Sequence, residues 1–292
     1  MRELAVLLLS LSPGDEIPSV AELAQRYKVG RGTVQAAFEA LRRDAGLRVA
    51  SHGPSASRLE ACDPAALWRA AGREGLLLLL PFPYSRRVMG LATALAELLR
   101  ESPVRHSLAY MRGARSRIEA LASGRADLAV ASALAAEEAR TTGACCEELL
   151  RLGPASYAAG QGWLVRSDFD LWPRSARIGT DSASAEQSTL PRALVPGDLD
   201  AEFREMPYLR MQEAVASGEV DAVVWPLDVP PAYEGLSIKP IGKALPEGAG
   251  QAVLLLRAGD RAARSLLGRA LAAEPLAAIQ ADVLAGRRPP TE

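Results

Sequence analysis

The spacing of apolar residues in the first sixty positions predicts three short helices. Met1–Ser10 has apolar residues at both helix and strand spacing, so the pattern alone leaves both open, and we interpret the segment as a helix that begins close to the start of the chain. Ser19 lies three residues before Glu22, which is the spacing of a capping box, and opens an amphipathic second helix. From Arg31 to about Arg43, apolar residues recur at i, i+3, i+4 and i+7, as they do on the buried face of a helix.

The segment after the third helix predicts a small hairpin. Gly46–Val49 has the composition of a short strand, Ser51–Ser55 that of a tight turn, and Arg58-Leu59 that of a returning strand. Three helices followed by such a hairpin are typical of a winged helix-turn-helix, an α+β domain that we place at residues 1–60. Asp63-Pro64 then opens a short helix to about Ala71, which we interpret as part of a linker at 61–74.

From residue 75 onward the pattern becomes an alternation of strands and helices. Leu76–Leu80 is a continuous apolar run, as expected of a strand buried on both faces. Predicted helices at 87–100 and 116–123 alternate with predicted strands at 107–111 and 127–131. This alternation predicts α/β architecture with a mostly parallel sheet.

One stretch of the α/β region is repeated. Glu119–Val130 contains a helix ended by a glycine, then an Asp and a buried strand, and Glu213–Val224 has the same pattern 94 residues later. Two matching units predict two lobes, with lobe 1 at about 75–160 plus 250–292 and lobe 2 at about 161–249. We expect the chain to cross between the lobes near 157–165 and 252–256. We expect the last helices, 261–271 and 275–284, to pack on lobe 1.

The N-terminal motifs resemble the GntR-type DNA-binding domain over its whole length. The matching positions are Gly14-Asp15-Glu16-Ile17-Pro18-Ser19, Glu22-Leu23-Ala24, Val29, Arg31, Thr33-Val34 and Leu41. The resemblance implies that the second motif helix reads the major groove and that the wing touches the minor groove. The chain departs from the family pattern at Ala21 and Gln35, where arginines are usual, at Gly30 instead of Ser, and at Pro54 instead of Gly.

Candidate DNA contacts follow from this resemblance and from groove chemistry. A helix N-terminus offers free N–H groups to phosphate, Arg31 suits a bidentate contact with guanine, and Gln35 suits adenine. The first sixty residues carry eight cations and seven anions, so their net charge is only +1. We predict operator binding by a homodimer on an inverted repeat. The predicted DNA-binding residues are Ser19, Lys28, Arg31, Gly32, Thr33, Gln35, Ser51 and His52.

A second group of motifs extends the resemblance to nearly the whole chain. These motifs are Pro81–Arg87, Gly90–Thr93, Leu108–Ala114, Arg117–Glu119, Gly153-Pro154, Ser156-Tyr157, Gly179, Asp181, Ser184, Asp221-Ala222 and Trp225. Together they are similar to the YhfZ-like regulators. That family joins a GntR-type reader to a C-terminal domain similar to type 2 periplasmic binding proteins. The resemblance therefore implies a two-lobed effector-binding domain at residues 75–292.

Ligands of open α/β lobes bind beyond the carboxyl ends of the strands. Arginines, hydroxyls and a helix N-terminus at that edge favour a small carboxylate or phosphate, and Asp181 or Asp228 would suit an amine or a sugar hydroxyl. We therefore predict a small, anionic metabolite as the ligand. The predicted ligand-binding residues are Tyr84, Ser85, Arg86, Arg87, Tyr110, Arg112, Ser132, Thr180, Asp181, Ser182, Ser184, Trp225 and Asp228.

Composition narrows the function classes. The chain of 292 residues is 49% hydrophobic and 24% charged with a net charge of −1, so it has material for large cores but no overall basic surface for nucleic acid. Three cysteines do not suit a disulfide framework, and the N-terminus lacks the features of a secretory signal, so we expect a cytoplasmic protein.

No catalytic or metal-binding motif stands out. Cys145-Cys146 has neither zinc nor redox spacing, the two histidines are isolated in the sequence, and no phosphate-binding glycine loop is present. We therefore expect no catalytic residues, no metal and no cofactor. The alternative to a regulator is a cytoplasmic two-lobed ligand-binding protein or enzyme whose helix-turn-helix does not bind DNA.

Overall fold

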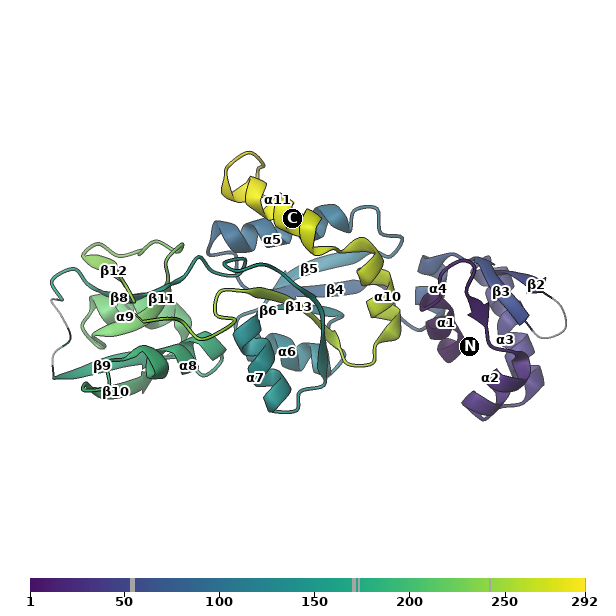
Figure 1. Ribbon diagram of the computed structural model, residues 1–292, viewed down its shortest axis with the longest axis horizontal. Coiled ribbons are helices and arrows are strands. Elements are labelled where there is room, and N and C mark those ends of the chain that lie inside the picture. Colours follow the sequence, from purple (N-terminus) through teal and green to yellow (C-terminus); the bar gives the residue numbers. More distant parts are fainter. Residues whose placement is uncertain (53–55, 170–171, 173, 242, 292) are drawn as a thin grey trace. The chain divides into compact units, whose positions relative to one another are not determined.

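The computed structural model describes all residues except 53–55, 170–171, 173, 242 and 292. The chain forms two compact units. The first comprises Met1–Leu77, Glu97–Ser107 and Gly259–Ala272, and the second comprises Leu78–Ala96, Leu108–Ala258 and Ala273–Glu292. Elements carry the labels of Figure 1.

The first unit contains the predicted winged helix-turn-helix. Its helices are α1 (Arg2–Leu9), α2 (Val20–Tyr27) and α3 (Arg31–Asp44). A three-stranded antiparallel sheet of order β1-β3-β2 is formed by β1 (Glu16–Ile17), β2 (Arg48–His52) and β3 (Ala56–Ala61). The predicted helices and hairpin are confirmed, whereas β1 was not predicted. The predicted turn at 51–55 is wrong for Ser51 and His52, which lie in β2, and Gly53, Pro54 and Ser55 lie outside the described residues.

Local chemistry explains why these helices form where they do. The Ser19 hydroxyl accepts a hydrogen bond from the Glu22 amide at 3.2 Å, and the Ser19 amide donates to the Glu22 carboxylate at 2.7 Å. This is a complete capping box, and it fixes the start of α2. On α3 the buried side chains are Val34, Phe38 and Leu41, which repeat at helical spacing and place the polar face outward.

Two further helices belong to the first unit. The linker helix α4 (Pro64–Ala70) begins at Asp63, whose carboxylate caps the Ala65 amide at 2.8 Å. The helix α10 (Arg261–Ala270) packs against α1. We predicted from the sequence that this helix packs on lobe 1, so its contact with the winged helix is an addition that the pattern did not indicate.

The second unit is built on two five-stranded mixed sheets (Figure 1). The first has the order β5-β4-β6-β13-β7 and the second β10-β9-β11-β8-β12. The strands of the first sheet are β4 (Leu76–Leu80), β5 (His106–Tyr110), β6 (Leu128–Ser132), β7 (Cys146–Arg151) and β13 (Ala252–Arg257). Those of the second are β8 (Gln161–Arg166), β9 (Ser175–Thr180), β10 (Asp200–Glu205), β11 (Ala222–Pro226) and β12 (Leu236–Pro240).

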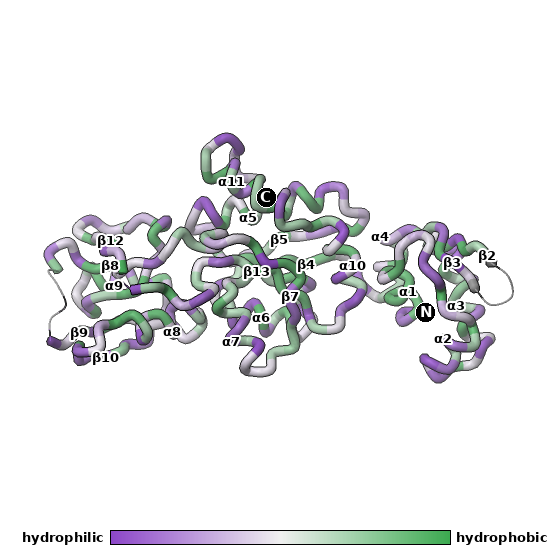
Figure 2. The backbone as a smooth tube through the Cα atoms, viewed as in Figure 1, coloured by the Kyte–Doolittle hydropathy of each residue, from purple (hydrophilic) through white to green (hydrophobic). Residues whose placement is uncertain are grey.

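The two sheets share one plan, which makes each of them a lobe. In each, a strand that has just crossed from the other lobe runs antiparallel between two neighbours: β8 pairs with β11 and β12, and β13 pairs with β6 and β7. These strands are almost fully buried. Figure 2 shows hydrophobic stretches along β13 and along β4, another strand of the first sheet.

The internal repeat corresponds to equivalent positions in the two sheets. The helices α6 (Ala114–Ala122) and α9 (Met211–Ala216) lead into β6 and β11, which are the third strands of their sheets. Gly124 (φ +75°) and Gly218 (φ +76°) end the helices in the left-handed region that glycine adopts without cost. The predicted helix–glycine–strand unit is therefore confirmed in both lobes.

The remaining helices cover the sheets. They are α5 (Arg86–Leu98), α7 (Ala133–Thr141), α8 (Ala185–Leu194) and α11 (Ala273–Leu284), with a short 3-10 turn at Tyr208–Arg210. The helix α11 lies against α5 at Gly90, where an added Cβ would be 3.0 Å from the Gln280 side chain. The Gln280 amide donates to the Ser156 carbonyl at 2.7 Å, so α11 also fixes the loop that leads to the crossing strand β8.

Candidate ligand pocket and DNA-reading helix

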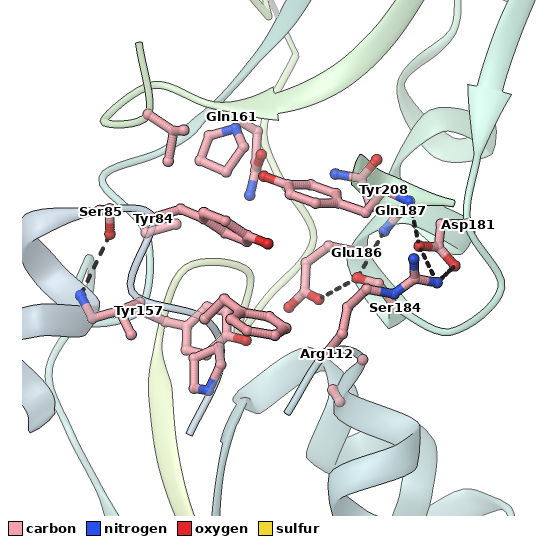
Figure 3. A pocket seen from close by; sticks show the side chains of 18 of the residues that line it. Tyr84, Ser85, Arg112, Tyr157, Gln161, Asp181, Ser184, Glu186, Gln187 and Tyr208 are labelled. Carbon is pink, nitrogen blue, oxygen red and sulfur yellow. Dashed lines mark hydrogen bonds and ion pairs between the residues drawn. The ribbon is translucent and has the colours of Figure 1, made fainter. Parts of the chain in front are cut away.

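A pocket lies between the two lobes of the second unit (Figure 3). It contains about 790 Å³ of unfilled space, part of which is open to solvent. Lobe 1 contributes the segments after β4 and β5, and lobe 2 contributes the segments after β9 and β11. These are carboxyl ends of strands, the edge that the sequence analysis predicted.

The structure brings six of the predicted ligand-binding residues to this pocket. Two follow β4, one follows β5, two follow β9 and one follows β11. They are Tyr84, Ser85, Arg112, Asp181, Ser184 and Asp228.

Four other predicted residues have structural partners and lie outside the lining. The Arg86 guanidinium donates to the Val283 carbonyl of α11 at 2.9 Å. Ser132 is buried and caps α7, and Trp225 is 3% exposed in the core of lobe 2, where its indole donates to the Val229 carbonyl at 2.9 Å. The Thr180 hydroxyl is 3.3 Å from the Glu205 carboxylate.

Three more predicted residues are also placed outside the lining. The Ser182 amide donates to Glu205 at 2.7 Å, and Tyr110 is the last residue of β5. Arg87 lies one step behind the pocket, since its guanidinium is 3.3 Å from the lining residue Asp228 and donates to the Ala155 carbonyl. Arg87 therefore contacts the pocket lining at Asp228.

Two ion pairs connect the lobes at the pocket. Arg112 of lobe 1 is 3.1 Å from Asp181 of lobe 2, and Arg87 of lobe 1 is 3.3 Å from Asp228 of lobe 2. Asp181 is buried and also accepts hydrogen bonds from the amides of Ala183 and Tyr208, both at 2.9 Å. These bonds hold the carboxylate in place to receive Arg112 (Figure 3).

The lobes also touch closely beside Arg112. Gly113 has φ +79°, and a Cβ built on it would lie only 2.8 Å from the Ala183 carbonyl oxygen of lobe 2. Only glycine fits this backbone conformation and this distance without a shift of the chain. Gly113 is also the N-cap of α6, and no side chain caps that helix. The first N–H groups of α6 therefore have no side-chain cap at a helix end where Gly113 and Ala114 line the pocket.

Arg117 is a pocket residue that sequence reasoning missed. It is 1% exposed and donates to the carbonyls of Val130 at 2.9 Å and Met111 at 2.7 Å. Its remaining nitrogen donates to the Tyr157 hydroxyl at 3.1 Å. Burial raises the pKa of Tyr157, so this phenol stays protonated at neutral pH. The helical spacing around Arg117 indicated a buried position but not that it borders a pocket.

A series of aromatic rings runs from the pocket lining to Trp225 in the core of lobe 2. The ring centroids are 5.6 Å apart for Phe82 and Tyr84, 5.8 Å for Tyr84 and Tyr208, and 4.7 Å for Tyr208 and Trp225, which stack nearly parallel. Burial raises the pKa of Tyr84 and, more strongly, that of Tyr208, so both hydroxyls remain neutral. Tyr208 lies in a 3-10 turn shortly after β10, a strand that the sequence pattern did not predict, so this residue was not found.

The other lining residues missed by the sequence analysis are mostly small or polar. Two of them, Glu186 and Gln187, occupy the first turn of α8 directly after the predicted Ser184, and Gln161 is the first residue of a crossing strand. The full set is Pro81, Phe82, Val88, Gly113, Ala114, Arg117, Tyr157, Ala158, Gln161, Glu186, Gln187, Tyr208, Pro226 and Val229.

The predicted DNA-reading surface lies in the first unit. Arg31, Gly32, Thr33 and Gln35 are all exposed in the first turns of α3, and its N-cap Gly30 leaves that end without a side-chain cap. The arrangement gives this helix end free N–H groups beside a guanidinium, an amide and a hydroxyl.

The other predicted DNA contacts flank this helix. Ser19 is exposed at the start of α2, and Lys28 ends α2 in a left-handed conformation, with φ 53° and ψ 46°. The backbones of Ser51 and His52 lie in β2, and their side chains are outside the part of the chain that the structure describes.

Among the described residues, no group of three or more His, Cys, Asp or Glu side chains is placed to hold a metal ion. Within the same residues, none of the helices has the length and hydropathy that a membrane crossing requires.

Comparisons with known proteins match both parts of the chain. Residues 3–54 match the family "Bacterial regulatory proteins, gntR family", and residues 63–291 match "YhfZ C-terminal domain". The chain is 30% identical over 293 residues to the protein YhfZ of Escherichia coli (strain K12), covering 99% of this chain and 95% of that protein. The crystal structure of YhfZ from Shigella flexneri is 30% identical with a TM-score of 0.62, covering 79% of this chain and 98% of that one.

The fold of the second unit has wider parallels. The periplasmic VFT2 domain of BvgS from Bordetella pertussis is similar with a TM-score of 0.50 at 20% identity, covering 73% of this chain and 94% of that one. The two mixed sheets have the type 2 periplasmic-binding-protein fold that the resemblance predicted. With a GntR-family domain at the N-terminus and a YhfZ C-terminal domain over most of its length, the chain belongs to the YhfZ family.

Proposed function

We propose that this protein is a ligand-responsive transcriptional regulator that binds operator DNA through its winged helix and a small metabolite through the pocket between its lobes. The observation that carries the proposal is the pocket itself, which lies between two lobes that are joined to a GntR-family domain. A protein that only binds DNA would not need this pocket, and a transport protein would not need a DNA-binding domain.

The DNA contacts centre on the N-terminus of α3. Arg31 would make a bidentate contact with guanine, and Gln35 would serve adenine, while Thr33 and the free amides of the first turn hold phosphate. Because most helix-turn-helix readers bind two half-sites, the protein acts as a homodimer on an inverted repeat.

The metabolite binds with a carboxylate or phosphate toward the N-terminus of α6. Gly113 and Ala114 at that helix end line the pocket, and the charge of the neighbouring Arg112 is paired with Asp181. An anion at this place interacts favourably with the helix dipole and with the uncapped N–H groups.

Ligand binding acts on the lobes through the contacts that join them. The pairs Arg112–Asp181 and Arg87–Asp228 cross the pocket, so a ligand seated between them favours the closed arrangement of the lobes. It shifts the equilibrium between open and closed forms by its difference in affinity for the two. DNA affinity changes by the same coupling free energy.

The test of DNA binding is the fluorescence anisotropy of a labelled duplex from the upstream region of the protein's own gene. We expect binding that weakens steeply between 50 and 200 mM salt, as phosphate neutralisation requires (about 10³-fold or more for six contacts). Random DNA should bind more weakly at the same salt.

The variant Arg31→Ala should reduce affinity for the upstream duplex by about 1–3 kcal/mol, because it removes a base contact. Arg43→Ala is the matched control, since Arg43 is exposed at the other end of α3 and pairs with Asp44. Equal effects of the two substitutions would contradict reading by the N-terminus of α3. Absence of binding by the folded protein at every salt concentration would favour a ligand-binding protein whose helix-turn-helix does not bind DNA.

A further inference from the structure

Glu186 places a carboxylate in the pocket that the protein itself does not neutralise. The residue is only 6% exposed and lies in the first turn of α8. One carboxylate oxygen accepts a hydrogen bond from the Ser184 hydroxyl at 3.2 Å. The other is buried and accepts none from any described residue. A buried carboxylate without a partner costs several kcal/mol, so a partner at this position would bind with a large gain.

The arginines around the pocket are already engaged elsewhere. Arg112 pairs with Asp181, and the two amides that also bind Asp181 hold that pair in place. Arg87 pairs with Asp228. Arg117 directs all three of its nitrogens to the carbonyls of Val130 and Met111 and to the Tyr157 hydroxyl. No ion pair found among the described residues includes Glu186.

Gln187, next to Glu186, has a second buried acceptor atom without a donor. Gln187 is 3% exposed, and its amide nitrogen donates to the Val224 carbonyl at 2.8 Å, which fixes the orientation of the side chain. Its amide oxygen has no donor among the described residues, and neither has the amide oxygen of Gln161, which is 6% exposed. All three side chains line the pocket, so the pocket offers acceptors that require N–H or O–H donors.

The rings around Glu186 suit a cation as well. Figure 3 shows the Glu186 carboxylate pointing into the pocket on the side of Tyr84 and Tyr157. Glu186 and Tyr157 both line the pocket. Tyr84 and Tyr208 are neighbours in the aromatic series, and the faces of neutral phenols attract ammonium groups.

We propose that the pocket holds a primary ammonium group of its ligand, with Glu186 as the counter-ion and the amide oxygen of Gln187 as a second acceptor. This inference rests on the proposed function and names the chemical class of its ligand. A neutral hydroxyl would leave the Glu186 charge unpaired, and a quaternary ammonium would bring no N–H donor. Combined with an acidic group at the N-terminus of α6, the ligand is zwitterionic, as an amino acid is.

The probe for the test is a deproteinised metabolite extract of the source organism, added to the full-length protein while its melting temperature is recorded. Half of the extract is first treated with an amine-acetylating reagent, which is then quenched. The control half receives reagent that was quenched beforehand. The control extract should raise the melting temperature. The acetylated extract should not, because acetylation converts the amine into an amide, which carries no positive charge to pair with Glu186.

The outcomes separate this inference from the proposed function. Stabilisation that survives acetylation overturns the ammonium proposal and leaves a ligand-binding regulator in place. If no extract stabilises the protein, the proposed ligand binding fails, and the inference fails with it.

The variant Glu186→Gln gives an independent readout. It keeps the shape and the Ser184 contact but loses the charge, so about 10- to 100-fold more extract should be needed for half of the maximal shift. Without extract its melting temperature should equal or exceed that of the wild type, because a buried unpaired charge has been removed. Glu119→Gln, on the exposed side of α6, should change neither value. A lower melting temperature in Glu186→Gln with an unchanged extract response would assign Glu186 a structural role and overturn the proposal.

Discussion

At Lys28 the backbone conformation favours glycine, whereas DNA binding favours a positively charged side chain. It holds the left-handed conformation at the end of α2, and among the described non-glycine residues it shares a positive φ only with Ala155. A side chain in this conformation costs about 1–2 kcal/mol, and glycine is the usual residue at such a helix end. A lysine here places its charge beside the start of α3, where phosphate is expected.

We predict that Lys28→Gly raises the free energy of unfolding by about 0.5–1 kcal/mol, because relief of strain exceeds the added chain entropy. The same variant should bind the upstream duplex more weakly, with a salt dependence reduced by about one phosphate contact. Lys28→Ala loses the charge but keeps the strain, so it should lower DNA affinity without the gain in stability. Urea unfolding and anisotropy measure the two effects, and a lower stability of Lys28→Gly would refute the strain argument.

A second prediction concerns a substitution of Gly113. Its position requires both a positive φ and close contact with the Ala183 carbonyl of lobe 2. Gly113→Ala should therefore reduce the rise in melting temperature that the metabolite extract causes. The new methyl group pushes the lobes apart beside the Arg112–Asp181 pair.

Gly143→Ala is the control for this substitution. Gly143 has a nearly identical φ of +77°, but nothing lies within 4 Å of an added Cβ. It carries the same conformational cost of about 1 kcal/mol without the contact between lobes. If the two variants respond to extract equally, the close approach at Gly113 has no role in ligand binding.

Among the elements, α10 packs against α1 and so belongs to the same unit as the winged helix. Arg73, next to α4, lies over the Trp68 ring at 4.6 Å and is 2.6 Å from the Asp260 carboxylate. Asp260 also caps α10 through the Ala263 amide at 3.1 Å. One carboxylate thus starts α10 and binds it to the linker helix region within the first unit.

We predict that Asp260→Ala lowers the free energy of unfolding by about 2–4 kcal/mol, because it removes a helix cap and leaves the partly buried Arg73 without this partner. Asp260→Asn keeps the capping oxygen and should lose less than half as much. Thermal or urea unfolding of the full-length protein measures both. Equal losses would mean that the cap contributes nothing.

The elements also show how far a single sequence predicts this structure. Most helices and strands were found because their apolar residues repeat at helical or strand spacing. The strand β1 was missed because a two-residue strand has no period, and it exists only through its pairing with β3. The amphipathic pattern of α10 shows that one face is buried, but not that α1 covers it.

The candidate site was predictable where a residue follows a strand that the sequence pattern had indicated. Tyr84, Arg112 and Asp181 do so and reach the pocket. Tyr208 follows β10, which was not predicted, and Glu186 reaches the pocket from the first turn of α8. Arginine content alone favoured an anion, whereas the partners of those arginines are visible only in three dimensions.

Across the whole molecule, the proposed regulator couples the DNA-reading helix and the pocket through one equilibrium. The winged helix presents the N-terminus of α3, and the second unit encloses a pocket between two lobes of the same plan. By thermodynamic linkage, a ligand that changes DNA affinity has its own affinity changed by DNA to the same degree. Regulatory coupling of about 1–3 kcal/mol would change either affinity about 5- to 150-fold.

The most direct test of this coupling is operator anisotropy at fixed salt, with and without the extract dilution that saturates the melting-temperature shift. The account predicts that extract moves the wild-type binding midpoint at least fivefold, and that acetylated extract does not. In Glu186→Gln the midpoint should stay unchanged at the same dilution, although the variant still binds DNA. A wild-type midpoint that does not move while the melting temperature rises would contradict the account, because ligand binding and DNA binding would then be independent.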